Sequence, residues 1–249
     1  HTLTAEANAN ALKMFDAAIE ADPENAQAYA WKACTLGQAM VRGYVDKPMQ
    51  EIMPEFSNLM SSALSIDPND FECHRLQCAV NTMMGDMKAA LEHGKKAYDV
   101  NPNDPRILQQ YGEVLLKTGK TEEGCDLTLL ALEYDPIAQG QTNSDKRKSD
   151  GVFGCVLDDR PEVGLDIASG MIDRSEKVLV YSAALAVSST GALENFSWLI
   201  DDLKDANFEK IEEAIEEMGK FDVVVQSKLK EVFLDHILPS NLKIYRQIL

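Results

Sequence analysis

The sequence lacks most of the features that mark an enzyme, a membrane protein or a nucleic-acid-binding protein. Its four histidines are scattered over 249 residues, and it contains no phosphate-binding glycine loop, His-Glu-x-x-His motif or nucleophile elbow. No apolar run approaches the ~18 residues that a membrane span requires. Basic residues number 24 against 41 acidic ones, and the net charge of −17 repels nucleic acid and anionic membranes. We therefore expect no catalytic residue, no cofactor, no nucleic-acid partner and no membrane partner.

Cysteine is also sparse, and its five residues are scattered rather than paired. An odd number of cysteines without close pairing argues against a disulfide framework and favours a reducing, cytoplasmic compartment. Cys73, His74 and Cys78 lie close together in sequence, but a zinc site needs a second such pair of ligands, and the sequence has none. We therefore predict no metal site and assign the cysteines to helix–helix contacts.

What the sequence does contain is a recurring Asp-Pro or Asn-Pro pair, at Pro23, Pro68, Pro102 and Pro136. The last three prolines are 34 residues apart, and the first interval, of 45 residues, is 11 longer. Each pair ends an amphipathic run with an alanine five residues before the proline, namely Ala18, Ala63, Ala97 or Ala131. Proline lacks an amide hydrogen and disfavours helical geometry in the preceding residue, so each pair ends one helix and precedes another. The period predicts successive pairs of helices.

The 34-residue unit resembles the tetratricopeptide repeat, a helix–turn–helix module, over residues 5–136. The matching residues in the last two units are Gly85, Ala90, Ala97, Pro102, Tyr111, Gly112, Leu115, Gly119, Ala131 and Pro136. The sequence departs from the repeat where Gly124 replaces an alanine and where the usual tryptophan is absent. The resemblance implies an all-α fold, a right-handed superhelical solenoid of antiparallel helix pairs, and a scaffold rather than a shared activity.

We expect two parts, with the repeated helix pairs in residues 5–136 and degenerate, TPR-like repeats with C-terminal capping helices in residues 137–249. The 11 extra residues around 43–56 make about three turns of helix, so lengthening both helices of this pair would preserve the facing of their apolar stripe. Pro48 and Pro54 predict an irregular connector, which either folds over one end of the groove between the repeats or is a longer hairpin with no special role.

Residues 137–149 are polar and predict a loop or a helix entry. Their basic trio of Lys146, Arg147 and Lys148 is expected to be solvated. Further helices are predicted at 147–158, 161–173, 176–190, 192–204, 207–219, 222–238 and 241–248.

In tetratricopeptide repeat proteins the first helices of successive pairs line a concave groove that holds a peptide or a partner helix. Carried over to this sequence, the resemblance implies a partner-binding groove formed by Gln27, Ala30, Cys34, Glu72, Arg75, Arg106, Gln109 and Glu113. Some members grip a C-terminal carboxylate with lysines and asparagines, but Ala30 and Glu72 at those places argue against that ligand. The mixture of charges favours a peptide bearing both signs.

Two functions remain open from the sequence. The first is a protein–protein interaction module whose groove binds a peptide or partner protein, a basic one in view of the acidic surface. The second is a self-associating scaffold without a peptide ligand, a homodimer formed through the end helix 5–21 or the C-terminal helix 222–238. Residues 85–124 are similar to repeat regions attached to class III cyclases and winged-helix regulators of bacteria. Because the chain also begins at His1 without a methionine, we expect a regulatory part of a larger protein.

Overall fold

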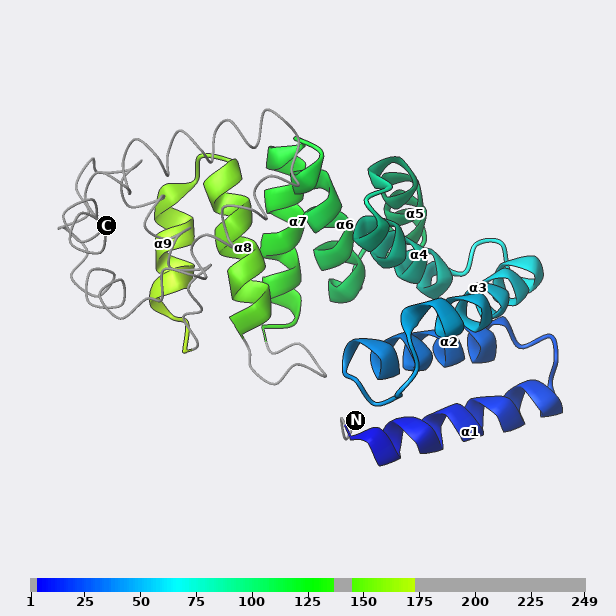
Figure 1. Cartoon of the computed structure of the whole chain (residues 1–249). Helices are drawn as coiled ribbons and strands as arrows, with labels where there is room; N and C mark the ends of the chain where they lie inside the picture. The colour runs from blue at the N-terminus through cyan, green and yellow to red at the C-terminus, as the bar shows by residue number, and fades with distance from the viewer. Residues whose placement is uncertain (1–3, 137–144, 173–249) are drawn as a thin grey trace. The chain divides into compact units, whose positions relative to one another are not determined.

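The computed structural model describes residues 4–136 and 145–172, and every regular element in these two ranges is an α-helix (Figure 1). In chain order the helices are α1 (Ala5–Ala21), α2 (Ala26–Val41), α3 (Met49–Ile66), α4 (Phe71–Met84), α5 (Met87–Val100), α6 (Pro105–Lys117), α7 (Thr121–Tyr134), α8 (Asp145–Leu157) and α9 (Pro161–Ser169). The predicted all-α fold is confirmed.

The Asp-Pro and Asn-Pro pairs end helices as the period predicts. Helices α1, α3, α5 and α7 stop immediately before Asp22, Asp67, Asn101 and Asp135. In each case the backbone N–H of this cap residue donates to the carbonyl oxygen of the repeated alanine four residues earlier. Gly85 ends α4 at a φ of 79° and Gly119 follows α6 at a φ of 82°. Glycine adopts this left-handed conformation without the strain that other residues incur, so both turns are sharp.

The extra length of the first interval lies mainly in helix. α3 begins at Met49 and continues through Pro54, so the connector after α2 is confined to residues 42–48. Ile52 and Phe56 lie in the buried core, which anchors the early turns of α3. The irregular connector is therefore shorter than the two prolines suggest, because Pro54 forfeits only one backbone hydrogen bond of the helix.

The chain divides into two compact units, residues 1–110 and residues 111–249, with the division inside α6. In the first unit α1 packs on α2, α2 on α3, and α4 on α5, and both α2 and α3 contact α4. Its core combines small and large side chains, and the small ones let neighbouring helices approach closely. The core residues are Ala30, Ala33, Cys34, Leu36, Ile52, Phe56, Leu59, Met60, Ala63, Cys73 and Leu76.

In the second unit α7 packs on α8, and α8 packs on α9. A Cβ atom added to Gly112 would lie 3.0 Å from the carbonyl oxygen of Gly124, and one added to Gly124 would lie 2.9 Å from that of Gly112. The two backbones touch, so the glycine that departs from the repeat pattern at 124 has a steric reason.

The start of α8 corrects the prediction of a solvated basic trio. Arg147 is only 2% exposed, and its Nη2 lies 3.0 Å from an oxygen of Asp135. Lys148 donates from Nζ to the carbonyl oxygen of Gly170 at 2.8 Å. Helix α8 begins two residues before the helix predicted at 147–158. Helix α9 ends four residues before the end of the helix predicted at 161–173. The helices predicted from residue 176 onward lie outside the described residues.

Candidate partner-binding site

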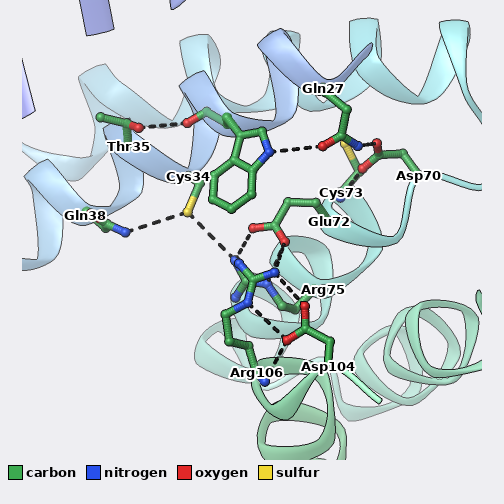
Figure 2. A network of polar contacts seen from close by, with 11 residues as sticks. Gln27, Cys34, Thr35, Gln38, Asp70, Glu72, Cys73, Arg75, Asp104 and Arg106 are labelled. Carbon is green, nitrogen blue, oxygen red and sulfur yellow. Dashed lines mark hydrogen bonds and ion pairs between the residues drawn. The ribbon is translucent and has the colours of Figure 1, made fainter. Parts of the chain in front are cut away.

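The predicted groove residues of the first unit come from α2, α4 and the beginning of α6. The structure brings four of them, Cys34, Glu72, Arg75 and Arg106, into one polar network (Figure 2). Glu72 is its centre, and its side chain is fully buried. Because a buried carboxylate is stable only when it is paired, the network has a structural role whatever else it does.

Glu72 joins α4 to α6 through two guanidinium groups. Arg75 donates from Nε to Oε2 at 3.2 Å and from Nη2 to Oε1 at 2.5 Å. Arg106 places Nη2 at 3.3 Å from Oε2. Burial by itself would lower the pKa of Arg75, but the hydrogen bond and the negative charge of Glu72 outweigh it and raise that pKa. Arg75 therefore keeps its charge next to the Glu72 side chain inside the protein.

Asp104 orients Arg106 and caps α6 at the same time. Its Oδ1 accepts from the backbone N–H of Arg106 at 2.8 Å and from Nε at 3.1 Å, and its Oδ2 accepts from Nη2 at 2.6 Å. Burial would raise the pKa of Asp104, but these hydrogen bonds outweigh it and lower that pKa. The Arg106 guanidinium also lies 5.4 Å from the centre of the Trp31 ring, which adds a cation–π contact to α2.

Cys34 borders the network on α2. Arg75 Nη2 and Gln38 Nε2 approach its sulfur at 3.7 Å and 3.8 Å. Burial raises the pKa of the thiol, although the charge of Arg75 opposes the change. Cys34 is therefore a neutral thiol that fills space under the network.

Three further residues belong to this site and were missed by the sequence analysis: Trp31, Asp70 and Asp104. Gln27 donates from Nε2 to Asp70, and its Oε1 accepts from the Trp31 indole N–H at 3.0 Å. Asp70 is 2% exposed and caps α4 by accepting from the backbone N–H of Cys73 at 2.7 Å.

A signal for these contacts was present in the repeat. Gln27, Glu72 and Arg106 each stand four residues after an Asp-Pro or Asn-Pro proline, so they occupy equivalent positions of successive units. Asp70 and Asp104 stand two residues after the proline, as Asn25 does, and all three cap the following helix with a side-chain oxygen. Residues at equivalent positions of stacked units are neighbours, and opposite charges at such positions predict an ion pair.

The remaining predicted residues have other surroundings. Ala30 is completely buried in the core. Gln109 is half-buried on α6. Glu113 belongs to the second unit, where it forms an ion pair with Lys117 at 2.6 Å.

Neither a metal site nor a membrane span is found in the part of the chain that the structure describes. In residues 4–136 and 145–172 no three His, Cys, Asp or Glu side chains are grouped so that they could ligate a metal ion. Over the same residues, none of the helices combines the length and the apolar character that crossing a membrane requires.

Comparison with known proteins identifies the fold but no family. No protein-family model matches the chain, and no curated protein matches it. Among solved structures it is similar to PilF of Pseudomonas aeruginosa, with a TM-score of 0.50 and 18% identity over 89% of this chain and 91% of that one. The fold is that of a tetratricopeptide-like repeat protein.

A second similar structure comes from Naa15/Naa10 bound to HypK-THB. Its TM-score is 0.41 at 15% identity, and the match covers 95% of this chain. This chain spans 33% of the length of that one.

Proposed function

We propose that this protein is an interaction scaffold that binds a peptide or a partner protein on the surface formed by α2, α4 and the beginning of α6. The observation that carries the proposal is the Glu72-centred network. It fixes the three helices relative to one another, which pre-organises a surface and lowers the entropy that a ligand must lose to bind it. The repeat fold supports the same reading, since its first helices are the ones that line a groove.

The exposed members of the site indicate the chemistry of the ligand. The Arg106 side chain is 38% exposed. Gln27 is exposed beside the half-buried ring of Trp31. These groups suit an extended peptide that places an acceptor on Arg106 and an apolar side chain on Trp31. The net charge of −17 attracts basic residues elsewhere in the same partner, so we infer a peptide bearing both signs.

We also propose a cytoplasmic, regulatory setting within a larger bacterial protein. All five cysteines are free and buried, as expected of a protein kept in reducing conditions. The similarity of residues 85–124 to repeat regions of bacterial regulators supports the regulatory part of this proposal.

Partner capture tests the binding surface. The immobilised chain is incubated with lysate of its source organism, the bound protein is identified by mass spectrometry, and its affinity is then measured for the variants Arg106→Gln and Lys95→Gln. Lys95 is the matched control because it is 62% exposed on α5, outside the network. We expect Arg106→Gln to weaken binding by about tenfold or more, equal to about 1.4 kcal/mol, and Lys95→Gln to leave it unchanged. Equal affinities for the two variants, both folded by their melting curves, would place the surface elsewhere.

The alternative is self-association through α1. No residue of this helix is buried, and Met14 is 73% exposed on it. Light scattering over a range of concentrations distinguishes the two functions. A dimer that Met14→Glu dissociates would favour the scaffold without a ligand, whereas a monomer that captures a partner supports the binding surface. The other predicted contact, helix 222–238, lies outside the described residues.

A further inference from the structure

Two thiols meet inside the second unit, where the proposed interaction surface plays no part. Cys125 on α7 and Cys155 on α8 place their sulfur atoms 3.9 Å apart, and both residues are completely buried. Both are free thiols. A disulfide bond is about 2.0 Å long, so a closure of about 2 Å separates the present contact from a covalent link.

Gly154 is the reason that the two helices approach so closely at this point. A Cβ atom added to Gly154 would lie 3.2 Å from Cys125 Cα and 2.9 Å from Thr128 Oγ1. The backbone of α8 therefore passes directly against α7 beside Cys125. A larger residue at 154 would push α8 away and separate the two sulfur atoms.

The surroundings distinguish the two sulfur atoms electrostatically. The contact between the two sulfur atoms lowers the pKa of Cys155 and raises that of Cys125. Burial and the charge of Asp158 disfavour the thiolate form of both cysteines, whereas the charge of Arg160 favours it. Arg160 is held by Asp126 and Asp158, each at 2.6 Å, with its side chain 29% exposed. The lower pKa makes Cys155 the better nucleophile, and Cys125 beside it is placed to act as the second, resolving cysteine of an oxidisable pair.

We propose that Cys125 and Cys155 form an oxidisable dithiol, which a small hydroperoxide converts into a disulfide that links α7 to α8. The Cys155 thiolate attacks one peroxide oxygen and becomes a sulfenic acid, and the other oxygen leaves as water after taking up a proton. The Cys125 sulfur then attacks the Cys155 sulfur and displaces its hydroxyl group as a second water. Two thiols and one hydrogen peroxide give one disulfide and two waters, so the sulfurs are oxidised and the peroxide is reduced.

Burial slows this reaction and limits it to oxidants small enough to reach the thiols. A completely buried thiol reacts slowly, so a small neutral peroxide enters when the α7–α8 pair opens locally. Once formed, the disulfide joins residues 30 apart and restricts the unfolded chain, which stabilises the second unit. The dithiol therefore acts as a stabilising link that forms when peroxide rises in an otherwise reducing environment.

The test treats the full chain with hydrogen peroxide under native conditions and maps the disulfides by peptide mass spectrometry. We expect a Cys125–Cys155 peptide, a higher melting temperature, and reversal of both by dithiothreitol. In Cys125→Ser the reaction should stop at the sulfenic acid, which dimedone labels at Cys155. Gly154→Ala should slow formation of the disulfide, and Cys34→Ala, the matched control, should leave it unchanged.

Three outcomes would overturn the proposed dithiol or the roles assigned to its two cysteines. A Cys125–Cys155 peptide that appears only after unfolding in denaturant would overturn the proposal, as would its absence after peroxide treatment of the native chain. A folded Cys125→Ser variant whose Cys155 resists dimedone under peroxide would overturn the assignment of Cys155 as nucleophile. The melting temperature of each variant before oxidation shows that it is folded.

Discussion

The two units hold their helices together with different chemistry. In the first, α4 and α6 are joined through a buried carboxylate and two guanidinium groups. In the second, Arg147 and Asp135 also form an ion pair, but the closest helix contacts depend on the absence of side chains, at Gly112, Gly124 and Gly154. A buried ion pair is strongly destabilised by the loss of one charge, whereas touching backbones are destabilised by added volume. The network of the first unit also reaches the surface at Arg106, beside the exposed Gln27, and the binding site is proposed there for this reason.

The largest expected effect is the removal of the central charge in the first unit. Glu72→Ala leaves Arg75 buried without its carboxylate, and loss of one partner from a buried pair costs about 3–5 kcal/mol. Urea unfolding measures the change. Glu113→Ala removes a partly exposed ion pair in the second unit and should cost about 0–1 kcal/mol.

The double variant Glu72→Gln with Arg75→Gln sharpens this prediction. It should recover part of the loss, because the uncompensated charge of Arg75 is removed with its partner. If Glu72→Ala lowers the free energy of unfolding no more than Glu113→Ala does, the network is not what joins the helices of the first unit.

Added volume is expected to matter most in the second unit. A methyl group at Gly124 would lie 2.8 Å from Leu116 Cγ and 2.9 Å from backbone atoms, so Gly124→Ala should cost about 1–3 kcal/mol. Gly151 on α8 provides the matched control, since a Cβ there lies at ordinary contact distances of 3.5–3.8 Å. Gly151→Ala should be neutral or stabilise by up to about 1 kcal/mol through helix propensity. Equal melting temperatures for the two variants would contradict the close contact of α6 with α7.

The same contrast explains how much could be predicted from the sequence. Where a helix ends at an Asp-Pro or Asn-Pro pair is decided by a local effect, because proline constrains only its own backbone and that of the preceding residue. The period therefore located the helix ends at Asp22, Asp67, Asn101 and Asp135 to within one residue. The fold class followed from the period in the same way.

The binding site depends on pairings that the local pattern does not show. Glu72 and Arg75 both lie on α4, as predicted. Glu72 is nevertheless buried, and it pairs with Arg106, which comes from the next repeat along the chain. Reversing the charge of Arg75 should therefore lower stability as well as affect a ligand, because Arg75 makes two hydrogen bonds to the buried Glu72. The pairing of Arg147 with Asp135 was missed for the same reason, since α8 begins outside the regular period.

A larger side chain should also destabilise the first unit at the positions of the repeated alanines. Ala97 is completely buried on α5, and Ala97→Leu should overfill its contact at a cost of about 1–3 kcal/mol. Ala89→Leu, on the same helix but only half-buried, is the control and should change stability much less. Thermal melting of the two variants compares them directly. An unchanged melting curve for Ala97→Leu would show that the first unit, unlike the second, has room at its small residues.

The smallest expected effect is a dependence of the first unit on pH. His74 donates from Nε2 to the carbonyl oxygen of Pro68 at 3.0 Å, so its Nδ1 must accept from His93 Nδ1–H, also at 3.0 Å. Burial lowers the pKa of both rings, and the neighbouring Lys96 acts in the same direction, whereas Asp67 and Asp70 beside His74 and Glu92 beside His93 oppose it.

Burial and the nearby charge of Lys96 disfavour a proton on either ring, so the folded state favours neutral rings. Because the unfolded chain binds protons more readily, stability is complete above the unfolded pKa of about 6.5 and falls as the pH drops from there towards the lowered folded values. Urea unfolding between pH 7.5 and pH 5, compared for the wild type and His93→Gln, measures this as about 1 kcal/mol or less. The variant should lose less stability on acidification, because one of the two suppressed protonations is gone. The same loss in both proteins would show that the histidine pair contributes nothing to the packing of α4 on α5.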